Sequence, residues 1–202
     1  EYYSLVRPKQ VPQEGETPSQ ALENRGIAYV ELRAVDVNPY SPIGINEDTA
    51  GFLEVGALYR LLQDSPALFG EEQEIIEQNQ TEVVNRGRAP NAAILADGQC
   101  YPIEDWCAIH LQRMQPLAEL LNQTYATDLY SNAMKMMQIR VDEVDATLSA
   151  LVVGDTRTQG SMWHFGQHLA QQHSSVYEAH QLSPETLAYF EEMSQKSLQQ
   201  QQ

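Results

Sequence analysis

The sequence predicts an α+β fold, with strands in its first quarter and helices over most of the remainder. Residues 27–37 are rich in β-branched, aromatic and aliphatic side chains and contain neither Gly nor Pro, which is typical of a strand. Asp97-Gly98 lies between two short apolar runs and predicts a hairpin. From Pro102 onward, apolar residues recur with the 3.6-residue period of helices. No repeat or sharp change of composition marks a second domain, so we expect residues 1–202 to belong to one.

The length, composition and net charge of the chain indicate a folded protein and exclude some classes of partner. The chain has 202 residues, 42% of them hydrophobic, which is enough for a sizeable core. Its formal net charge is −16, from 28 acidic and 12 basic residues, which argues against nucleic acid or an anionic membrane surface as a general partner. No apolar run reaches the roughly 18 residues that a transmembrane helix needs.

The start of the chain and its two cysteines suggest where the protein works. The sequence begins at Glu1, without an initiator Met or a signal peptide, so we expect a piece of a longer chain. Cys100 and Cys107 lie seven residues apart, a spacing that matches neither a zinc site nor a CxxC redox motif. We therefore expect buried, reduced thiols and a cytoplasmic protein.

Residues 2–9 are predicted to form a strand that precedes a short helix. Alternation along this strand places Tyr3, Leu5 and Arg7 on one face, and Pro8 indicates an edge or the strand's end. The following residues 17–20 carry the signature of a capping box, with Thr at the N-cap, Pro at the first helical position and Gln at the third. Gly26 suits the end of that helix.

The strand predicted at residues 27–37 has two unlike faces, because successive side chains of a strand point to opposite sides. One face is small and apolar, formed by Ala28, Val30, Leu32 and Ala34. The other carries Tyr29, Glu31 and Arg33. A carboxylate and a guanidinium two residues apart could hold a metal ion and a phosphate side by side. From the spacing alone, a cross-strand ion pair on a solvated face is the simpler interpretation.

The middle of the chain mixes an irregular passage, a capped helix and a polar stretch. Prolines at 39 and 42 predict an irregular extended passage. Asn46 can cap a helix whose expected core stripe is Phe52, Val55, Tyr59 and Leu62. Residues 63–90 are acidic and Gln-rich and end with Arg86 and Arg88, which fit either a solvated basic turn or a phosphate contact.

Four helical patterns fill the remainder. The first stripe is Ile103, Cys107, His110, Met114, Leu117 and Leu121, with a kink expected at Pro116. The second is Met134, Met137, Val141, Val144, Leu148 and Leu151, ending near Gly154. The third starts near Ser161 and uses Met162, Phe165, Leu169, His173 and Val176. A last helix begins at Ser183-Pro184 and ends in a Gln-rich tail that we expect to fray.

Catalytic and metal-binding motifs are scarce. His164 and His168 lie four residues apart and share a helix face, but the Glu of a zincin helix and a third ligand are absent, so we expect no metal there. His110 and His173 lie on apolar stripes and are expected to be hydrogen-bonded packing residues. The sequence contains no phosphate loop, dinucleotide fingerprint or nucleophile elbow.

The segment YVELRAVDVNPYSPIGI, residues 29–45, closely resembles part of glutamate–cysteine ligase of the proteobacterial type. Four further motifs that resemble the family are YSLVRPK at 3–9, GETPS at 15–19, RGI at 25–27 and GRAP at 87–90. The helical remainder resembles the family in length and character only. On this resemblance the chain corresponds to roughly the C-terminal two-fifths of such an enzyme.

The resemblance implies a fold and an activity. The fold would be part of a curved antiparallel sheet like that of glutamine synthetase's catalytic domain, with active-site strands in residues 1–45 and a mainly helical region in 46–202. The activity would be ATP-dependent joining of the γ-carboxylate of L-glutamate to L-cysteine through a γ-glutamyl phosphate, the first step of glutathione biosynthesis. The cofactor would be Mg²⁺, with Mn²⁺ as the alternative ion, and ATP a co-substrate.

The resemblance also implies roles for single residues. Glu31 would be a Mg²⁺ ligand, and Arg33 would contact the phosphoryl group in transfer. Tyr3 would help form the pocket for cysteine, and Arg7 and Lys9 would be a basic pair near the phosphates. Other metal-binding carboxylates and most glutamate-binding groups would come from a preceding part of the domain, so this piece alone is expected to be inactive.

Two alternatives remain open at the level of sequence. One is a related carboxylate–amine ligase that accepts another amine, because the phosphoryl chemistry is shared. The other is a non-catalytic, acidic helical interaction module that retains an inert remnant of the sheet.

Overall fold

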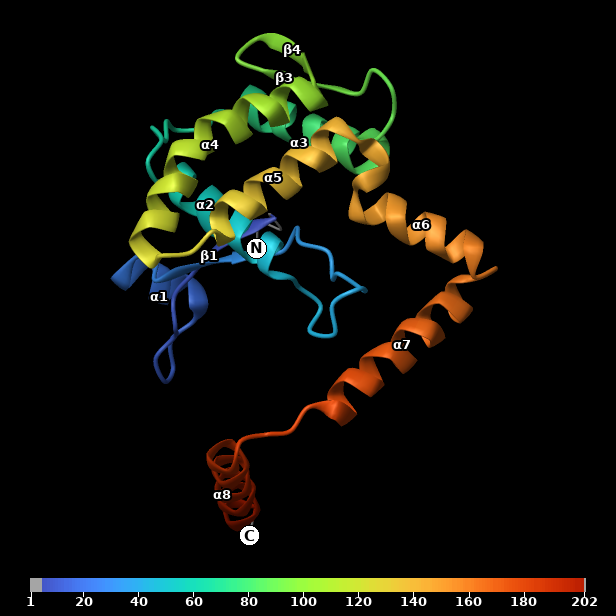
Figure 1. Cartoon of the computed structure of the whole chain (residues 1–202). Helices are drawn as coiled ribbons and strands as arrows, with labels where there is room; N and C mark the ends of the chain where they lie inside the picture. The colour runs from blue at the N-terminus through green and yellow to red at the C-terminus, as the bar shows by residue number, and fades with distance from the viewer. Residues whose placement is uncertain (1–4, 202) are drawn as a thin grey trace. The chain divides into compact units, whose positions relative to one another are not determined.

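The protein is described here by a computed structural model, which describes residues 5–201 (Figure 1). The chain divides into two compact units, Glu1–Asn38 and Pro39–Gln202. The first contains two strands and a short helix, and the second is mostly helical with one β-hairpin. An α+β composition is therefore confirmed. The prediction that all 202 residues belong to one catalytic domain stays a prediction.

The first unit is built on two antiparallel strands, β1 (Val6–Lys9) and β2 (Tyr29–Leu32), joined through α1 (Pro18–Arg25). The predicted capping box is confirmed, because the Thr17 hydroxyl accepts from the backbone N–H of Gln20 and the Gln20 side chain accepts from that of Thr17. Gly26 ends the helix with a φ of 72°, which a residue with a side chain rarely adopts.

β2 is shorter than the strand predicted at 27–37. Its ladder spans four residues, and one hydrogen bond beyond each end joins Ala28 to Lys9 and Arg33 to Leu5. A strand extends only as far as a neighbouring strand pairs with it. Within residues 5–201, β2 pairs with β1 alone, so the length of β1 limits that of β2. Pro8 lies inside β1, where a missing N–H is tolerated because both strands of the pair are edges.

The second unit contains nine further helices and strands and one 3₁₀ turn among the described residues. They are α2 (Glu47–Leu61), α3 (Gly70–Arg86), β3 (Ala93–Ala96), β4 (Gln99–Pro102), α4 (Ile103–Tyr125), α5 (Leu129–Asp142), the 3₁₀ turn η1 (Val144–Ala146), α6 (Leu148–Thr158), α7 (Met162–Ala179) and α8 (Pro184–Gln200). None of the helices in residues 5–201 combines the length and apolarity that crossing a membrane requires.

The core of the second unit lies among α2, α4 and α5, which pack on one another (Figure 1). Its buried members are Val55, Tyr59, Leu111, Met114, Ala118, Leu121, Tyr130 and Met134. Gly51 allows α2 to approach α5 closely, because a Cβ at this position would lie 3.3 Å from side-chain atoms of Ala133 and Leu129. Three helices that bury one stripe each are enough to form a continuous core.

Several predicted caps and turns are confirmed. Asn46 caps α2 by accepting from the N–H of Thr49, and Ser161 and Ser183 cap α7 and α8 in the same way. The β3–β4 hairpin turns at Asp97 and Gly98, both with positive φ, as the type I′ preference for this dipeptide requires.

Other predictions need correction. Leu62 caps the end of α2 and is 72% exposed, so it is not part of the core. The second apolar stripe is not one helix but two, because the chain leaves the α region at Glu143 and Thr147. The Thr147 hydroxyl donates to the Val144 carbonyl there and offers the backbone an alternative to the helix. α6 also continues past Gly154 to Thr158. Pro116 lies inside α4, and the kink expected there stays a prediction.

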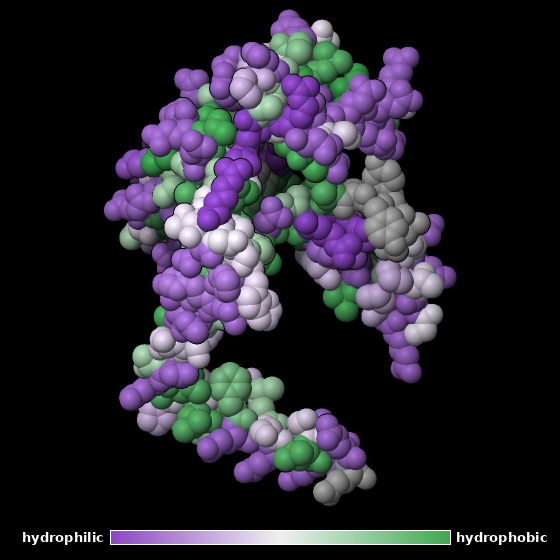
Figure 2. Space-filling model, turned by 90° about the vertical axis from the view of Figure 1, so that its right-hand side faces the viewer, coloured by the Kyte–Doolittle hydropathy of each residue, from purple (hydrophilic) through white to green (hydrophobic). Residues whose placement is uncertain are grey.

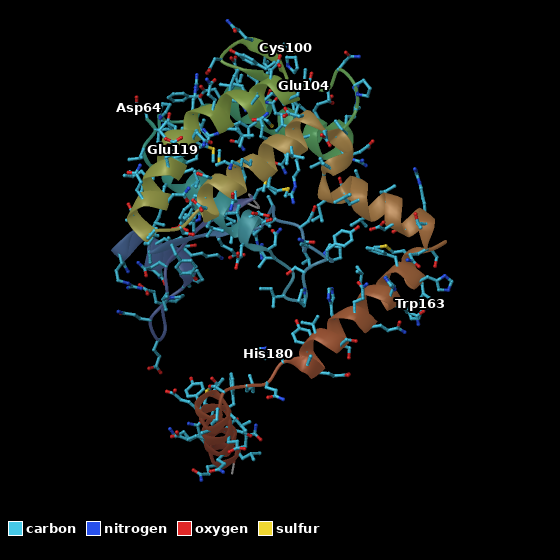
Figure 3. The ribbon with its side chains drawn as sticks, viewed as in Figure 1. Asp64, Cys100, Glu104, Glu119, Trp163 and His180 are labelled. Carbon is cyan, nitrogen blue, oxygen red and sulfur yellow. The ribbon has the colours of Figure 1, made fainter. Side chains whose placement is uncertain are left out.

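The expectation of buried thiols is wrong for Cys100. This residue lies on the exposed β3–β4 hairpin (Figure 3), whereas Cys107 lies on α4 and is partly buried. Both thiols are free, and burial raises the pKa of Cys107. A hairpin of two short strands cannot cover its own side chains, which explains the exposure of Cys100.

The core predicts a clear contrast between two valines. Val55→Ala is expected to lower the free energy of unfolding by about 2 kcal/mol, because the wild-type side chain is fully buried and its loss leaves a cavity. Val84→Ala, at a position of α3 that is 75% exposed, should change it by less than about 0.5 kcal/mol. Urea unfolding followed by circular dichroism measures both, and equal effects would contradict the proposed core.

Candidate functional site

A charged cluster occupies one face of the β1–β2 pair. In the observed register Arg7 pairs with Glu31 and Lys9 pairs with Tyr29. Directly opposed residues of antiparallel strands lie on the same face, and alternation adds Arg33 to that face. We call Arg7, Lys9, Glu31 and Arg33 the charged strand face. The sequence-based expectation that Glu31 and Arg33 share a face is therefore confirmed, with Arg7 beside them.

Glu31 is the centre of this face. One of its carboxylate oxygens lies 3.3 Å from the Lys9 Nζ, and the other lies 2.5 Å from the Arg33 Nε. The hydrogen bond from Lys9 and the positive charge of Arg33 lower the pKa of Glu31 below its usual value of 4.5. The three side chains are 30–49% exposed, so the ion pairs are solvated and position the groups more than they stabilise the fold.

Arg7 differs from its neighbours because it is only 8% exposed, and it is the buried charged residue of the described chain. A buried side chain is restricted in its rotamers. The Cα of Arg7 is paired with that of Glu31, so Arg7 belongs to the same strand face as this carboxylate.

The remaining predicted residues fall elsewhere. Tyr3 lies outside the described residues. Arg86 is in the last turn of α3 and pairs with Glu82 at 3.6 Å, and Arg88 is exposed just beyond that helix. His164 and His168 are exposed on α7, the helix that also carries the exposed Trp163 (Figure 3). Within residues 5–201 no group of three or more His, Cys, Asp or Glu side chains is placed to hold a metal ion.

The described residues do not form a Mg²⁺ site by themselves. Mg²⁺ prefers six oxygen ligands in octahedral geometry. Glu31 supplies one carboxylate, and both of its oxygens are engaged by Lys9 and Arg33. Glu31 can therefore serve only as one ligand among others that residues 5–201 do not provide.

The two histidines predicted to pack do so, each with a polar partner. His110 lies 3.3 Å from the Tyr59 hydroxyl through Nδ1 and contacts the ring of Trp106. Burial, and secondly the positive charges of Arg60 and Arg113, lower its pKa. His173 lies 2.8 Å from the Pro39 carbonyl through Nε2. Sequence reasoning missed this last contact, because nothing in the spacing joins residues 134 positions apart.

Comparison with known proteins bears on these residues directly. The family described as Glutamate-cysteine ligase matches residues 1–83, a range that includes the whole charged strand face. A glutamate–cysteine ligase of Pseudomonas fluorescens is 39% identical over all 202 residues, and one of Azotobacter vinelandii is 37% identical over 199 residues. The chain spans 38% of the length of these relatives.

Solved structures agree with the sequence relatives. A glutamate–cysteine ligase from Francisella tularensis, crystallised in complex with AMP, superposes with a TM-score of 0.86 at 28% identity, covering 99% of this chain and 39% of that one. A bifunctional glutathione synthetase from Pasteurella multocida gives 0.63 at 25% identity, covering 86% of this chain and 21% of that one. The class to which the chain is related is thus that of the amino-acid ligases. Within it, the chain is a relative of the glutamate–cysteine ligases, as its motifs indicate.

The ion pairs of Glu31 predict a measurable titration. In metal-free buffer, Lys9→Met should raise the pKa of Glu31 towards its usual value, and more than Arg33→Met does, because the bond from Lys9 is the larger cause of the shift. A depressed carboxylate pKa stabilises the fold above 4.5, and that contribution is lost as pH falls through the folded pKa. Carboxyl ¹³C NMR follows the titration. Lys196→Met, on α8, should leave it unchanged, and an equal response to both lysine variants would contradict the pairing.

Proposed function

We propose that this chain is part of an ATP-dependent ligase that joins the γ-carboxylate of L-glutamate to the amine of L-cysteine. The observation that carries the proposal is the charged strand face. A chain with a net charge of −16 places three of its 12 cationic side chains around one carboxylate, within the residues that the ligase family matches. Such a concentration of positive charge suits phosphate groups.

The reaction has two steps. A γ-carboxylate oxygen of glutamate attacks the terminal phosphorus of ATP, the bond to ADP breaks, and an acyl phosphate forms. The cysteine amine then attacks the acyl carbon, the carbon–oxygen bond to phosphate breaks, and the amine loses a proton. Negative charge moves over the phosphoryl oxygens in both steps, and fixed cations lower the barrier by stabilising that charge.

Each residue of the charged strand face has a distinct part in this proposal. Arg33, nearly half exposed, would contact the phosphoryl group in transfer. Arg7 and Lys9 would bind neighbouring phosphate oxygens, with Arg7 as the rigid member because it is buried. Glu31 would keep Lys9 and Arg33 in place and act as one ligand of the Mg²⁺ that accompanies ATP. Tyr3 is retained as part of the cysteine pocket on the resemblance alone.

We further propose that β1 and β2 belong to a larger, curved antiparallel sheet like that of glutamine synthetase. An isolated pair of short strands is marginally stable in water. Among the described residues both outer edges of this pair lack a strand partner, and Val6, Val30 and Leu32 on its apolar face are 41–51% exposed. Further strands from the 62% of the relatives' length that this chain does not match would cover them.

The purified 202-residue chain is expected to synthesise no γ-glutamylcysteine. One carboxylate cannot hold Mg²⁺, and the described residues contain no group of three or more His, Cys, Asp or Glu side chains placed to hold a metal ion. Product analysis by mass spectrometry, with ATP, Mg²⁺, glutamate and cysteine present, measures this. Turnover by the chain alone would show that a complete site lies within it and would overturn the division of the site proposed here.

A replacement enzyme tests the function itself. In the Pseudomonas fluorescens ligase that is 39% identical, the matching residues are replaced by this chain. The resulting replacement enzyme is expected to release ADP in a cysteine-dependent reaction. In it, Glu31→Gln and Arg33→Ala should each lower kcat by about 10²–10³-fold, because Arg33 would stabilise charge in the transition state and Glu31 would hold the cations that do so.

The controls for this experiment lie in the helical unit. Glu192→Gln and Arg113→Ala are exposed changes of the same chemistry and should keep kcat within about 2-fold. A folded replacement enzyme without activity would contradict the proposed function. Activity that does not depend on cysteine but depends on another amino acid would support the phosphoryl-transfer chemistry and contradict cysteine as the substrate.

A further inference from the structure

His110 lies on α4, which packs against α2, and the proposed function leaves this residue unused. Its Nδ1 lies 3.3 Å from the hydroxyl of Tyr59, a core residue of α2 that is only 7% exposed. The two rings meet edge-on, with centroids 5.9 Å apart and an interplanar angle of 72°. The imidazole therefore joins the two helices by a polar contact and by a ring contact.

Trp106, one turn earlier on α4, packs on the same imidazole. Its ring lies edge-on to that of His110, with centroids 4.5 Å apart. It also meets the ring of Tyr101 in β4, with centroids 5.1 Å apart. These four residues thus form one run of ring contacts from α2 through α4 to the β3–β4 hairpin, in the order Tyr59, His110, Trp106 and Tyr101. We call this run the ring series, and displacement of the imidazole would interrupt it.

The Nε2 atom of His110 is buried and has no hydrogen-bond partner among the described residues. A neutral imidazole carries one N–H and one acceptor nitrogen, and either arrangement satisfies the contact between Nδ1 and Tyr59. A protonated imidazole carries two N–H groups, so Nε2 would become a buried donor on a charged ring without an acceptor. Burying a charge without a partner is costly, so this site favours the neutral ring.

The charged groups near His110 act in the same direction. Burial, and secondly Arg60 of α2 and Arg113 of α4, lower the pKa of His110 below its usual value of 6.5. Arg60 also lies over the ring of Tyr59, with its Cζ 5.5 Å from the centroid. The thiol of Cys107, one turn before His110, stays neutral because burial raises its pKa. Among the described residues, α5 and β4, which also pack on α4, add no charge that shifts the pKa of His110.

We propose that His110 is a proton-sensitive latch, whose neutral ring holds α2, α4 and the β3–β4 hairpin together and whose protonation opens the ring series. This role lies beyond the proposed function and does not depend on it. A charged imidazole gains solvation only by moving towards water, and it then leaves Tyr59 and Trp106. The latch is closed at neutral pH and opens in the weakly acidic range, where histidine titrates.

Proton linkage gives the direction of the effect. The pKa of His110 in the closed form lies below its usual value of 6.5, so the open form binds the proton more tightly. Stabilisation by the neutral ring is complete above 6.5 and is lost as pH falls through the pKa of the closed form. Between these two values, the equilibrium constant for opening should rise by up to about tenfold for each pH unit.

Trp106 can report the opening by its fluorescence. The chain has two tryptophans, so Trp163→Phe leaves Trp106 as the single reporter in the 202-residue chain. Acrylamide quenching of Trp106 should increase at least about 2-fold between about pH 7 and about pH 5, with a midpoint below 6.5. His110→Gln in this background does not titrate and should show one quenching constant across the range. His168→Gln, an exposed change on α7, should titrate like the parent.

Imidazole NMR of the unaltered chain is a test that does not depend on how a variant folds. The Cε1–H signal of His110 should titrate with a pKa below 6.5, and the amide signals of Tyr59 and Trp106 should shift with it. A His110 pKa at or above 6.5, or a titration that leaves both amide signals in place, would overturn the latch. Quenching of Trp106 that stays constant down to about pH 5, or that rises equally in His110→Gln, would overturn it as well.

Discussion

The register of β1 against β2 is the constraint on which the candidate site depends. Pairing Arg7 with Glu31 places these two residues on one face of the strand pair, where Lys9 and Arg33 form ion pairs with the same carboxylate. A shift of one residue would turn Glu31 and Arg33 together to the opposite face and separate them from Arg7 and Lys9. Exposed ion pairs of this kind contribute little to stability, so their arrangement is better understood as preparation of a charged surface than as support for the fold.

Local chemistry made much of this structure predictable. Alternation, helix caps, the Asp97-Gly98 turn and the main apolar stripes each depend on residues close in sequence, and each has a short list of conformations. The shared face of Glu31 and Arg33 was predictable for the same reason. The pairing of Arg7 with Glu31 depends on the register between the two strands. The sequence of either strand alone does not determine that register.

Features that depend on distant partners escaped prediction. α3 buries none of its residues, so the sequence shows no apolar stripe that would predict this helix. Its Asn79 side chain donates to the Leu95 carbonyl in β3 and accepts from the Leu95 N–H. The length of β2 was set by β1 and not by its own composition. The contact between Tyr40 and Asp155 joins residues 115 positions apart and left no local pattern.

Each of the two units exposes apolar side chains that no described residue covers. In the first unit, the apolar face of the strand pair is about half exposed, and Glu31 is a single carboxylate. In the second, α8 exposes the apolar side chains of Leu187, Tyr189, Phe190, Met193 and Leu198 (Figure 2). A 17-residue helix is only marginally stable in water without a packed face, and so is a two-stranded sheet. In the ligase proposed for this chain, residues beyond the 38% of the relatives' length that it spans would cover the strand pair and complete the ligand set around Glu31. The folding of the strand pair and the chemistry proposed for it would then depend on the same residues, so activity and stability should be gained together.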